Sequence, residues 1–157
     1  MTRRIRNTPT TYVREVELSY RRRASAAVQD TKGIATSRDV VALVQPLIGN
    51  RIVESLLVLA LSARNRVLGY HEVGRGTVSS CGVERADVFR YPLVVGANAV
   101  IVAHNHPSGS ATPSEEDIAF TRVLVQAGKI LGLPVLDHVI VADEASYSFL
   151  DAGLMVP

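Results

Sequence analysis

One stretch of the chain combines an apolar run, two histidines, a sharp turn and a long amphipathic segment, and it restricts the fold more than any other. Residues 99–103 are apolar and lead directly into His104, which predicts a short buried strand over residues 99–104. A helix is predicted from Pro113 or Ser114 to about Leu131, because apolar side chains repeat there at helical spacing and Gly and Pro follow. The histidines therefore lie in the connection between a strand and a helix.

The other predicted elements complete a sheet with helices around it. They are a half-exposed strand over 12–20, a helix that Ser37 caps and that Pro46 shortens or kinks, strands over 55–61 and 67–73, a helix over 84–97 with Pro92 inside, and strands over 135–142 and 147–150. Four residues, 63–66, join two of these strands and have hairpin length. The order predicts an α/β (α+β) fold, a central mixed β-sheet flanked by about three helices.

Length and composition indicate an ordinary globular protein. The chain has 157 residues and is 47% hydrophobic, enough for a substantial core. No membrane association is expected, because no stretch has eighteen uninterrupted apolar residues. The first residues are basic without an apolar segment, unlike a secretory signal, and the single Cys81 excludes an internal disulfide framework. We therefore expect a cytoplasmic protein.

Positive charge gathers at the beginning of the chain. Residues 1–23 hold seven arginines and two glutamates, a local balance of +5, whereas residues 24–157 hold ten basic and thirteen acidic residues. Such an arm permits contact with DNA or an acidic partner; the alternative is a solvated tail. The expected organisation is a basic N-terminal arm with one strand over residues 1–35 and a domain over 36–157 that contains the two histidines.

Two histidines and an aspartate form a candidate metal site. In an extended chain His104 and His106 point to the same face, and Asp117 falls in the first turn of the next helix. Two histidines and a carboxylate are a ligand set of catalytic zinc that keeps one position open for water. Alternatively, Ser114 and Asp117 form a capping box, and Thr112 with Pro113 offers a competing cap.

A site of this kind also needs a base that takes a proton from water, commonly a carboxylate that is not a ligand. Glu72 is the leading candidate, because it lies in the strand over 67–73 directly before a Gly-rich break. The alternative is an exposed strand position, since Arg66 and Arg75 indicate that this strand is partly solvated.

The arrangement resembles the JAMM/MPN+ metalloenzyme motif, and the RadC subfamily in particular. The similarity covers about residues 36–152. The matching residues are Glu72 followed by Arg75-Gly76-Thr77, Ala103-His104-Asn105-His106-Pro107-Ser108-Gly109, Thr112-Pro113-Ser114 with Asp117, and Leu136-Asp137-His138.

The resemblance implies a cytidine-deaminase-like, JAMM-type fold and a zinc site. It implies that His104, His106 and Asp117 bind Zn²⁺, with a water molecule in the fourth position. Glu72 would act as general acid/base, and Ser114 would hydrogen-bond the oxyanion of the tetrahedral intermediate. The implied activity is a zinc metallopeptidase that hydrolyses an amide or isopeptide bond in a protein or peptide substrate.

A second function follows from the RadC resemblance and the basic arm. RadC proteins usually carry an N-terminal helix-hairpin-helix region, and we expect it to be absent because only about 35 residues precede the similar region. The alternative is a DNA-associated protein, in DNA repair or a mobile element, whose metal site is vestigial or cleaves phosphodiesters. A purely structural scaffold is disfavoured, because the ligand residues are present.

Four further residues, Asp137, His138, His71 and Cys81, could take part in such a site. Asp137 and His138 either orient a metal-bound histidine or form a buried hydrogen-bonded pair at the start of a strand. His71 should face away from Glu72 on a strand and is given no catalytic role. Cys81 is interpreted as a small packed side chain.

Overall fold

The computed structural model of the chain describes residues 33–76 and 83–155. The predicted strand over 12–20, the basic arm up to residue 32 and Cys81 lie outside these residues. The elements in chain order are α1 (Ser37–Val44), η1 (Gln45–Gly49, a π-helical turn), β1 (Ser55–Leu61), β2 (Val67–Arg75), α2 (Arg85–Val94), β3 (Ala99–Asn105), α3 (Glu115–Leu131), β4 (Val135–Val141) and β5 (Ser146–Ser148).

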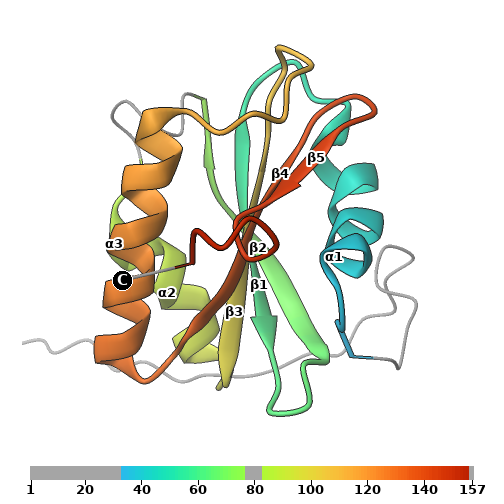
Figure 1. Ribbon diagram of the computed structural model, residues 1–157. Helices are drawn as coiled ribbons and strands as arrows, with labels where there is room; N and C mark the ends of the chain where they lie inside the picture. The colour runs from blue at the N-terminus through green and yellow to red at the C-terminus, as the bar shows by residue number, and fades with distance from the viewer. Residues whose placement is uncertain (1–32, 77–82, 156–157) are drawn as a thin grey trace, which may run out of the picture.

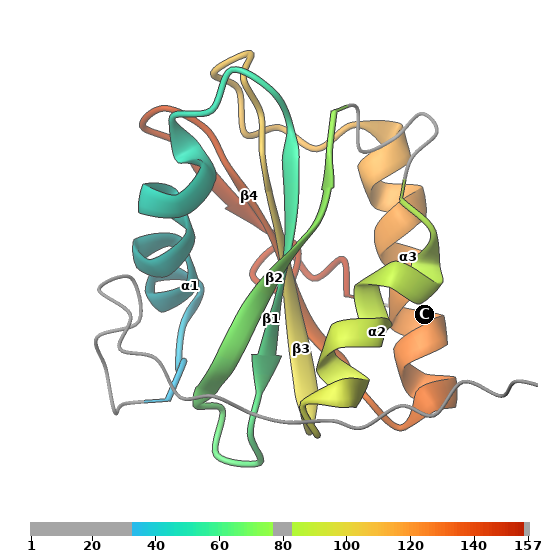
Figure 2. The same cartoon turned by 180° about the vertical axis from the view of Figure 1, so that it is seen from behind.

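The five strands form one mixed sheet in the order β2-β1-β3-β4-β5. β3 and β4 are parallel and are joined by α3, whereas the other neighbouring pairs are antiparallel. Helix α1 covers one face of the sheet, and α2 and α3 cover the other (Figures 1 and 2). This architecture confirms the predicted mixed α/β fold with three flanking helices.

The core has two halves because the central strands are covered on both faces. Every residue of β1 is buried, which explains why its sequence is apolar without alternation. Leu57, Leu59 and Leu61 pack in the cluster that includes α1. Leu56 and Val58 pack in the cluster that includes Val88 of α2 and Leu124 of α3. Which face a side chain occupies therefore decides which helices it meets.

Element ends differ from the sequence-based expectation by a few residues. Helix α1 is capped by Thr36 rather than Ser37, because the Thr36 side chain accepts from the Asp39 N–H while Oδ2 of Asp39 accepts from the Thr36 N–H at 2.8 Å. Helix α1 is short, as expected: it ends at Val44, and Pro46 lies in the first turn of the π-helical η1. Helix α2 continues through Pro92 and ends at Val94, and Gly96 follows in the left-handed conformation with a φ of 69°.

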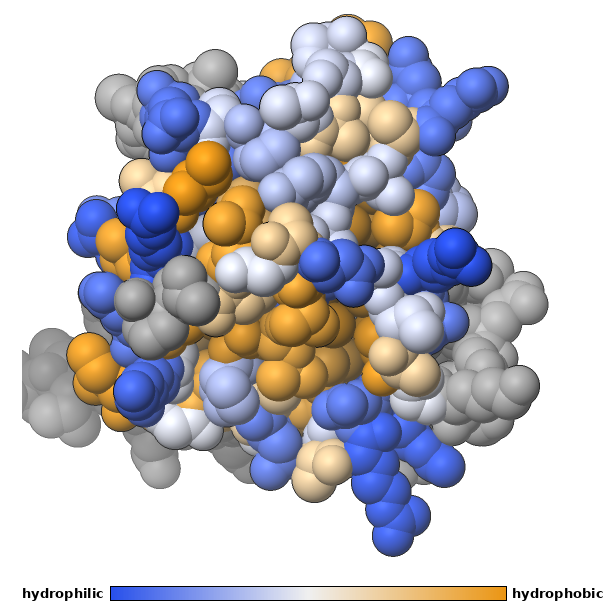
Figure 3. Space-filling view, in the orientation of Figure 1, coloured by the Kyte–Doolittle hydropathy of each residue, from blue (hydrophilic) through white to orange (hydrophobic). Residues whose placement is uncertain are grey.

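The sheet leaves apolar surface near the edge formed by β4 and β5. β5 pairs only with Val139–Val141, so the first half of β4 extends beyond it. A hollow of about 230 Å³ lies there, with Val40, Leu136 and Leu150 in its lining. The space-filling view shows apolar side chains gathered in the same region between α1 and α3 (Figure 3). Among the described residues, no helix has both the length and the apolar character to cross a bilayer.

Candidate metal centre

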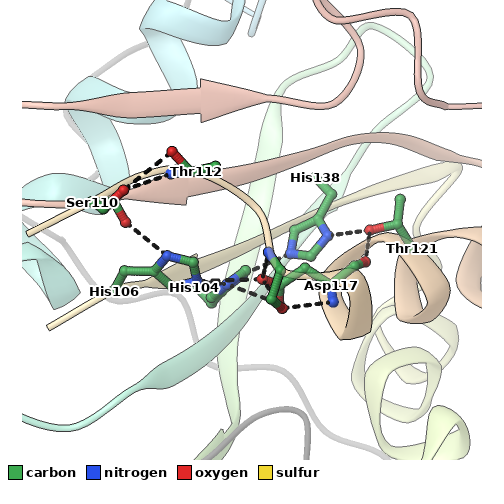
Figure 4. A network of polar contacts seen from close by, with 8 residues as sticks. His104, His106, Ser110, Thr112, Asp117, Thr121 and His138 are labelled. Carbon is green, nitrogen blue, oxygen red and sulfur yellow. Dashed lines mark hydrogen bonds and ion pairs between the residues drawn. The ribbon is translucent and has the colours of Figure 1, made fainter. Parts of the chain in front are cut away.

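His104, His106 and Asp117 meet at the carboxyl end of β3 (Figure 4). The Nε2 atoms of the two histidines are 2.9 Å apart. Oδ1 of Asp117 lies 3.3 Å from Nε2 of His104, and Oδ2 lies 3.4 Å from Nε2 of His106. His104 is fully buried and Asp117 nearly so. Each of the three residues offers one ligand atom, and these atoms lie within 4.8 Å of one another, so together they could hold a metal ion.

The hydrogen bonds of His106 direct a lone pair into this cluster. Its Nδ1 lies 2.8 Å from the main-chain carbonyl of Ser110. Because a carbonyl oxygen only accepts, Nδ1 must carry the hydrogen, and neutral His106 then has a free lone pair on Nε2. Imidazole nitrogens and a carboxylate oxygen directed at one point are the donor chemistry of a catalytic zinc site, so the residues present fit a metal ion.

Asp117 is both a member of the cluster and part of a helix cap. Its Oδ2 accepts from the Ser114 N–H at 2.8 Å and from the Ser114 hydroxyl at 2.6 Å, while Ser114 Oγ accepts from the Asp117 N–H at 3.1 Å. Burial raises the pKa of Asp117, but its hydrogen bond to His104, the His104 charge and the Ser114 hydrogen bonds hold that pKa well below its usual range. The two alternatives for Ser114 and Asp117 are therefore compatible, and the carboxylate is ionised.

His138 lies directly behind His104. Its Nε2 is 2.8 Å from Nδ1 of His104, and its Nδ1 is 2.6 Å from Oγ1 of Thr121 (Figure 4). The ring is fully buried, and burial, followed by the charge of His104, puts the pKa of His138 well below its usual value. His138 thus contacts a cluster histidine as a neutral ring.

Asp137 does not contact the cluster as His138 does, but accepts hydrogen bonds from three groups on β4, β5 and the segment after β5. Its Oδ1 accepts from the N–H groups of His138 and Leu150 at 2.7 and 2.9 Å, and its Oδ2 accepts from the Ser148 hydroxyl at 2.7 Å. Burial raises the pKa of Asp137 despite these hydrogen bonds. The carboxylate therefore ties the chain after β5 to β4. Asp137 thus belongs to a buried hydrogen-bonded arrangement at the start of β4, whereas His138 contacts a candidate ligand.

A polar pocket of about 340 Å³ adjoins the cluster. His106, Ser114 and Asp117 contribute to its lining, together with Glu54, Glu116 and the loop residues Ser108, Ser110 and Thr112. A substrate group could therefore approach the candidate ligands through a cavity that two further acidic residues, Glu54 and Glu116, also line.

Glu72 is not among the residues that line this pocket. It pairs with Leu57 of β1, whose side chain belongs to the core beneath α1, whereas His104 pairs with Leu56 and faces α3. Oε1 of Glu72 lies 2.9 Å from Arg51 and 2.8 Å from Arg75. The structure thus brings together four of the five predicted site residues and places Glu72 elsewhere. Its acid/base role stays a prediction.

Glu54 lines this pocket, although sequence reasoning did not single it out. It stands two positions before Leu56, so an extended chain places it on the same face as His104, next to His106. The available signal was an acidic residue immediately before the apolar run of β1. Choosing between Glu54 and Glu72 required the strand register, which the sequence does not display.

Asn105 anchors the segment that carries Glu54. Its side chain points away from the two histidines and is fully buried. Its Oδ1 accepts from the Ser55 N–H at 2.7 Å, and its Nδ2 donates to the carbonyls of Arg51 and Val53 at 3.1 and 3.2 Å. One residue of β3 therefore holds the chain on both sides of Glu54.

A mixed sheet with helices on both faces and a His-His-Asp cluster at the end of a central strand are consistent with the JAB/MPN fold. The profile of the RadC-like JAB domain matches residues 34–154, and the chain belongs to that family.

Relatives carry the descriptive name UPF0758 protein. Those of Symbiobacterium thermophilum and Carboxydothermus hydrogenoformans are 40% and 44% identical over 133 and 105 residues, which is 85% and 67% of this chain but 57% and 46% of theirs. That of Flavobacterium johnsoniae is 36% identical over 142 residues, 90% of this chain and 62% of the relative. The chain therefore spans less than two thirds of the length of these relatives.

Proposed function

We propose that this domain is a zinc-dependent hydrolase that cleaves an amide or isopeptide bond in a peptide or protein. The observation that carries the proposal is the convergence of two imidazole nitrogens and an ionised carboxylate beside a polar pocket. His104, His106 and Asp117 would hold the ion. A nitrogen-rich set of three ligands suits zinc better than magnesium or calcium, which prefer oxygen ligands. When bound, zinc supplies Lewis-acid activation of water and of the scissile carbonyl.

We assign the acid/base role to Glu54. Glu54 lines the pocket with His106 and Asp117, so its carboxylate would take a proton from the attacking water and return it to the leaving amine. Glu72 is less suited to this role, because two arginines hold it as a carboxylate on the other face of the sheet. A group held ionised by charged partners is a poor acid for the second step.

Ser114 would stabilise the oxyanion that forms during hydrolysis. Its hydroxyl borders the pocket and donates to Asp117. Rotation of this hydroxyl would turn its hydrogen toward a substrate oxygen, and the Ser114 N–H would still hold the Asp117 carboxylate. A single donor of this kind contributes roughly 3–4 kcal/mol to transition-state stabilisation.

The test compares wild type with Glu54→Gln and Glu72→Gln, a matched pair of isosteric substitutions. Zinc content is measured after purification without chelator, and cleavage is followed on a peptide and isopeptide library. We expect about one zinc per chain in all three proteins and a loss of cleavage of about 10²-fold or more in Glu54→Gln alone.

Two outcomes contradict the proposal in different ways. Loss of cleavage in Glu72→Gln but not in Glu54→Gln returns the acid/base role to Glu72. Wild-type protein that retains no zinc, with all three candidate ligands intact, contradicts the metallohydrolase itself.

A further inference from the structure

A series of short polar contacts begins at His104, passes through His138 and Thr121, and ends at Asp117. It connects Nδ1 of His104 to His138 at 2.8 Å, His138 to Thr121 at 2.6 Å, and Thr121 Oγ1 to the main-chain carbonyl of Asp117 at 2.6 Å (Figure 4). The series therefore connects two candidate metal ligands, His104 on β3 and Asp117 on α3.

The hydrogen atoms in this series of contacts can be assigned one after another. Thr121 has one hydroxyl hydrogen, which it donates to the Asp117 carbonyl. Oγ1 then accepts from Nδ1–H of His138, because neutral histidine carries one hydrogen. Nε2 of His138 is left as an acceptor for Nδ1–H of His104. Nδ1 of His104 therefore carries a hydrogen, which leaves Nε2 as the atom that can bind a metal ion.

The surroundings of His138 keep its ring in this orientation. The ring stacks on Phe149, with centroids 4.9 Å apart and an interplanar angle of 12°. Phe120 meets it edge-on at 6.4 Å. Because the ring is fully buried between these aromatic groups, rotation would separate its nitrogens from His104 and Thr121.

We propose that Thr121 and His138 are positioning residues that hold His104 in the tautomer able to bind zinc, and that they tie His104 to the residue that supplies the carboxylate ligand. The reverse direction of donation would put a hydrogen on Nε2 of His104 and close the site. This inference rests on the proposed function, since it concerns how the same site takes its metal.

Two substitutions at Thr121 separate hydrogen bonding from packing. Thr121→Val keeps the shape of the side chain but loses the hydroxyl, whereas Thr121→Ser keeps the hydroxyl and loses a methyl group. Zinc affinity is measured by competition with a chelating dye. We expect Thr121→Val to bind zinc about 10–100-fold more weakly than wild type, and Thr121→Ser to stay within about threefold. The proposal is overturned if wild type and both variants bind zinc with equal affinity, or if Thr121→Ser binds zinc more weakly than Thr121→Val.

The same idea is tested at the ring nitrogens. Nitrogen-15 NMR of zinc-loaded wild type should show both His104 and His138 protonated at Nδ1, and this measurement stands even if Thr121→Val does not fold. A hydrogen on Nε2 of His138 overturns the proposal. As a matched pair, His138→Gln should weaken zinc binding, and His71→Gln, on exposed β2, should not.

The outcomes for the two proposals are separable. Wild-type protein that binds zinc but cleaves no peptide contradicts the proposed hydrolase and leaves the positioning role of Thr121 and His138 standing. Cleavage by wild type, together with unchanged zinc affinity in Thr121→Val, contradicts the positioning role alone.

Discussion

Asp117 shows how one side chain can stabilise a helix and also remain available as a ligand. Oδ2 receives two hydrogens from Ser114 and also faces His106, while Oδ1 faces His104. Negative charge is favoured in the first turn of a helix, where main-chain N–H groups are unpaired. The cap thus holds the carboxylate in place before any cation arrives.

Glu72 should contribute to stability in a pH-dependent way. The hydrogen bond from Arg75 lowers its pKa most, and Arg51 adds to this effect against burial. Because the folded pKa lies below the unfolded value, the contribution is full above about pH 4.5 and is lost as the pH falls through the folded pKa. In metal-free protein, Glu72→Gln should lower the free energy of unfolding by at most about 1 kcal/mol at pH 7.

Urea unfolding of wild type and Glu72→Gln at a series of pH values checks this prediction. The difference between the two proteins should shrink as the solution is made acidic. A difference that is independent of pH would show that the ion pairs are not its cause.

At the scale of elements, β3 serves the site through both of its faces. His104 contributes to the cluster on the α3 face, whereas Asn105 holds the segment between Arg51 and Ser55. The alternation of a strand thus separates the candidate ligands from the group that positions Glu54. Substitution of Asn105 should therefore affect catalysis without removing zinc.

Asn105→Ala should retain about one zinc per chain but cleave peptide at least about 10-fold more slowly, because Glu54 loses its anchored segment. Leaving the Ser55 N–H without its partner should also lower the free energy of unfolding by about 1–3 kcal/mol. Zinc analysis, steady-state kinetics and denaturant unfolding measure the three effects. Asn98→Ala, at an exposed position directly before β3, is the control; equal effects in both variants contradict the assignment.

At the scale of the whole molecule, the candidate site joins two parts of the fold. His104 and His106 come from the end of β3 and the loop after it, and Asp117 comes from α3. A ligand that binds only the folded protein stabilises it by mass action. Metal binding should therefore be visible as a change in global stability.

Zinc at 100 times its Kd should stabilise the domain by about 2.7 kcal/mol, which raises Tm by roughly 5–11 °C for a chain of this size. Calorimetry or fluorescence melting with and without zinc measures the shift. Asp117→Asn keeps a similar shape at the helix cap but should lose most of the shift. An equal shift in Asp117→Asn would place the stabilising zinc at another site.

The basic arm supports a separate proposal at this scale, that the protein contacts DNA through residues 1–23. Seven arginines would release counterions from phosphates, so deleting the arm should weaken binding and flatten its salt dependence. Fluorescence anisotropy with duplex DNA at about 50 mM salt measures both. Replacing Arg21, Arg22 and Arg23 by Gln is the milder matched variant. If the intact chain binds no better than the shortened one, the arm is a solvated tail.

Local features of the sequence predicted much of the fold and most of the candidate site. The apolar run of β1, the helical spacing of α3 and the breaks at Gly and Pro depend on neighbouring residues, so they could be recognised directly. His104 and His106 are separated by one residue, and Asp117 is three positions after the cap Ser114, so their directions also follow from local geometry. These parts needed no knowledge of the tertiary structure.

Only the tertiary structure decided which glutamate faces the cluster and what lies behind His104. Glu54 and Glu72 are both close to β-strand sequences, but a register shift between Leu56 and Leu57 and the pairing with β3 determine the face of each. His138 reaches His104 because β4 lies parallel to β3 after the α3 crossover. Side-chain alternation is a property of one strand, whereas register and pairing arise between segments distant in the chain, and a slip of one residue reverses every face.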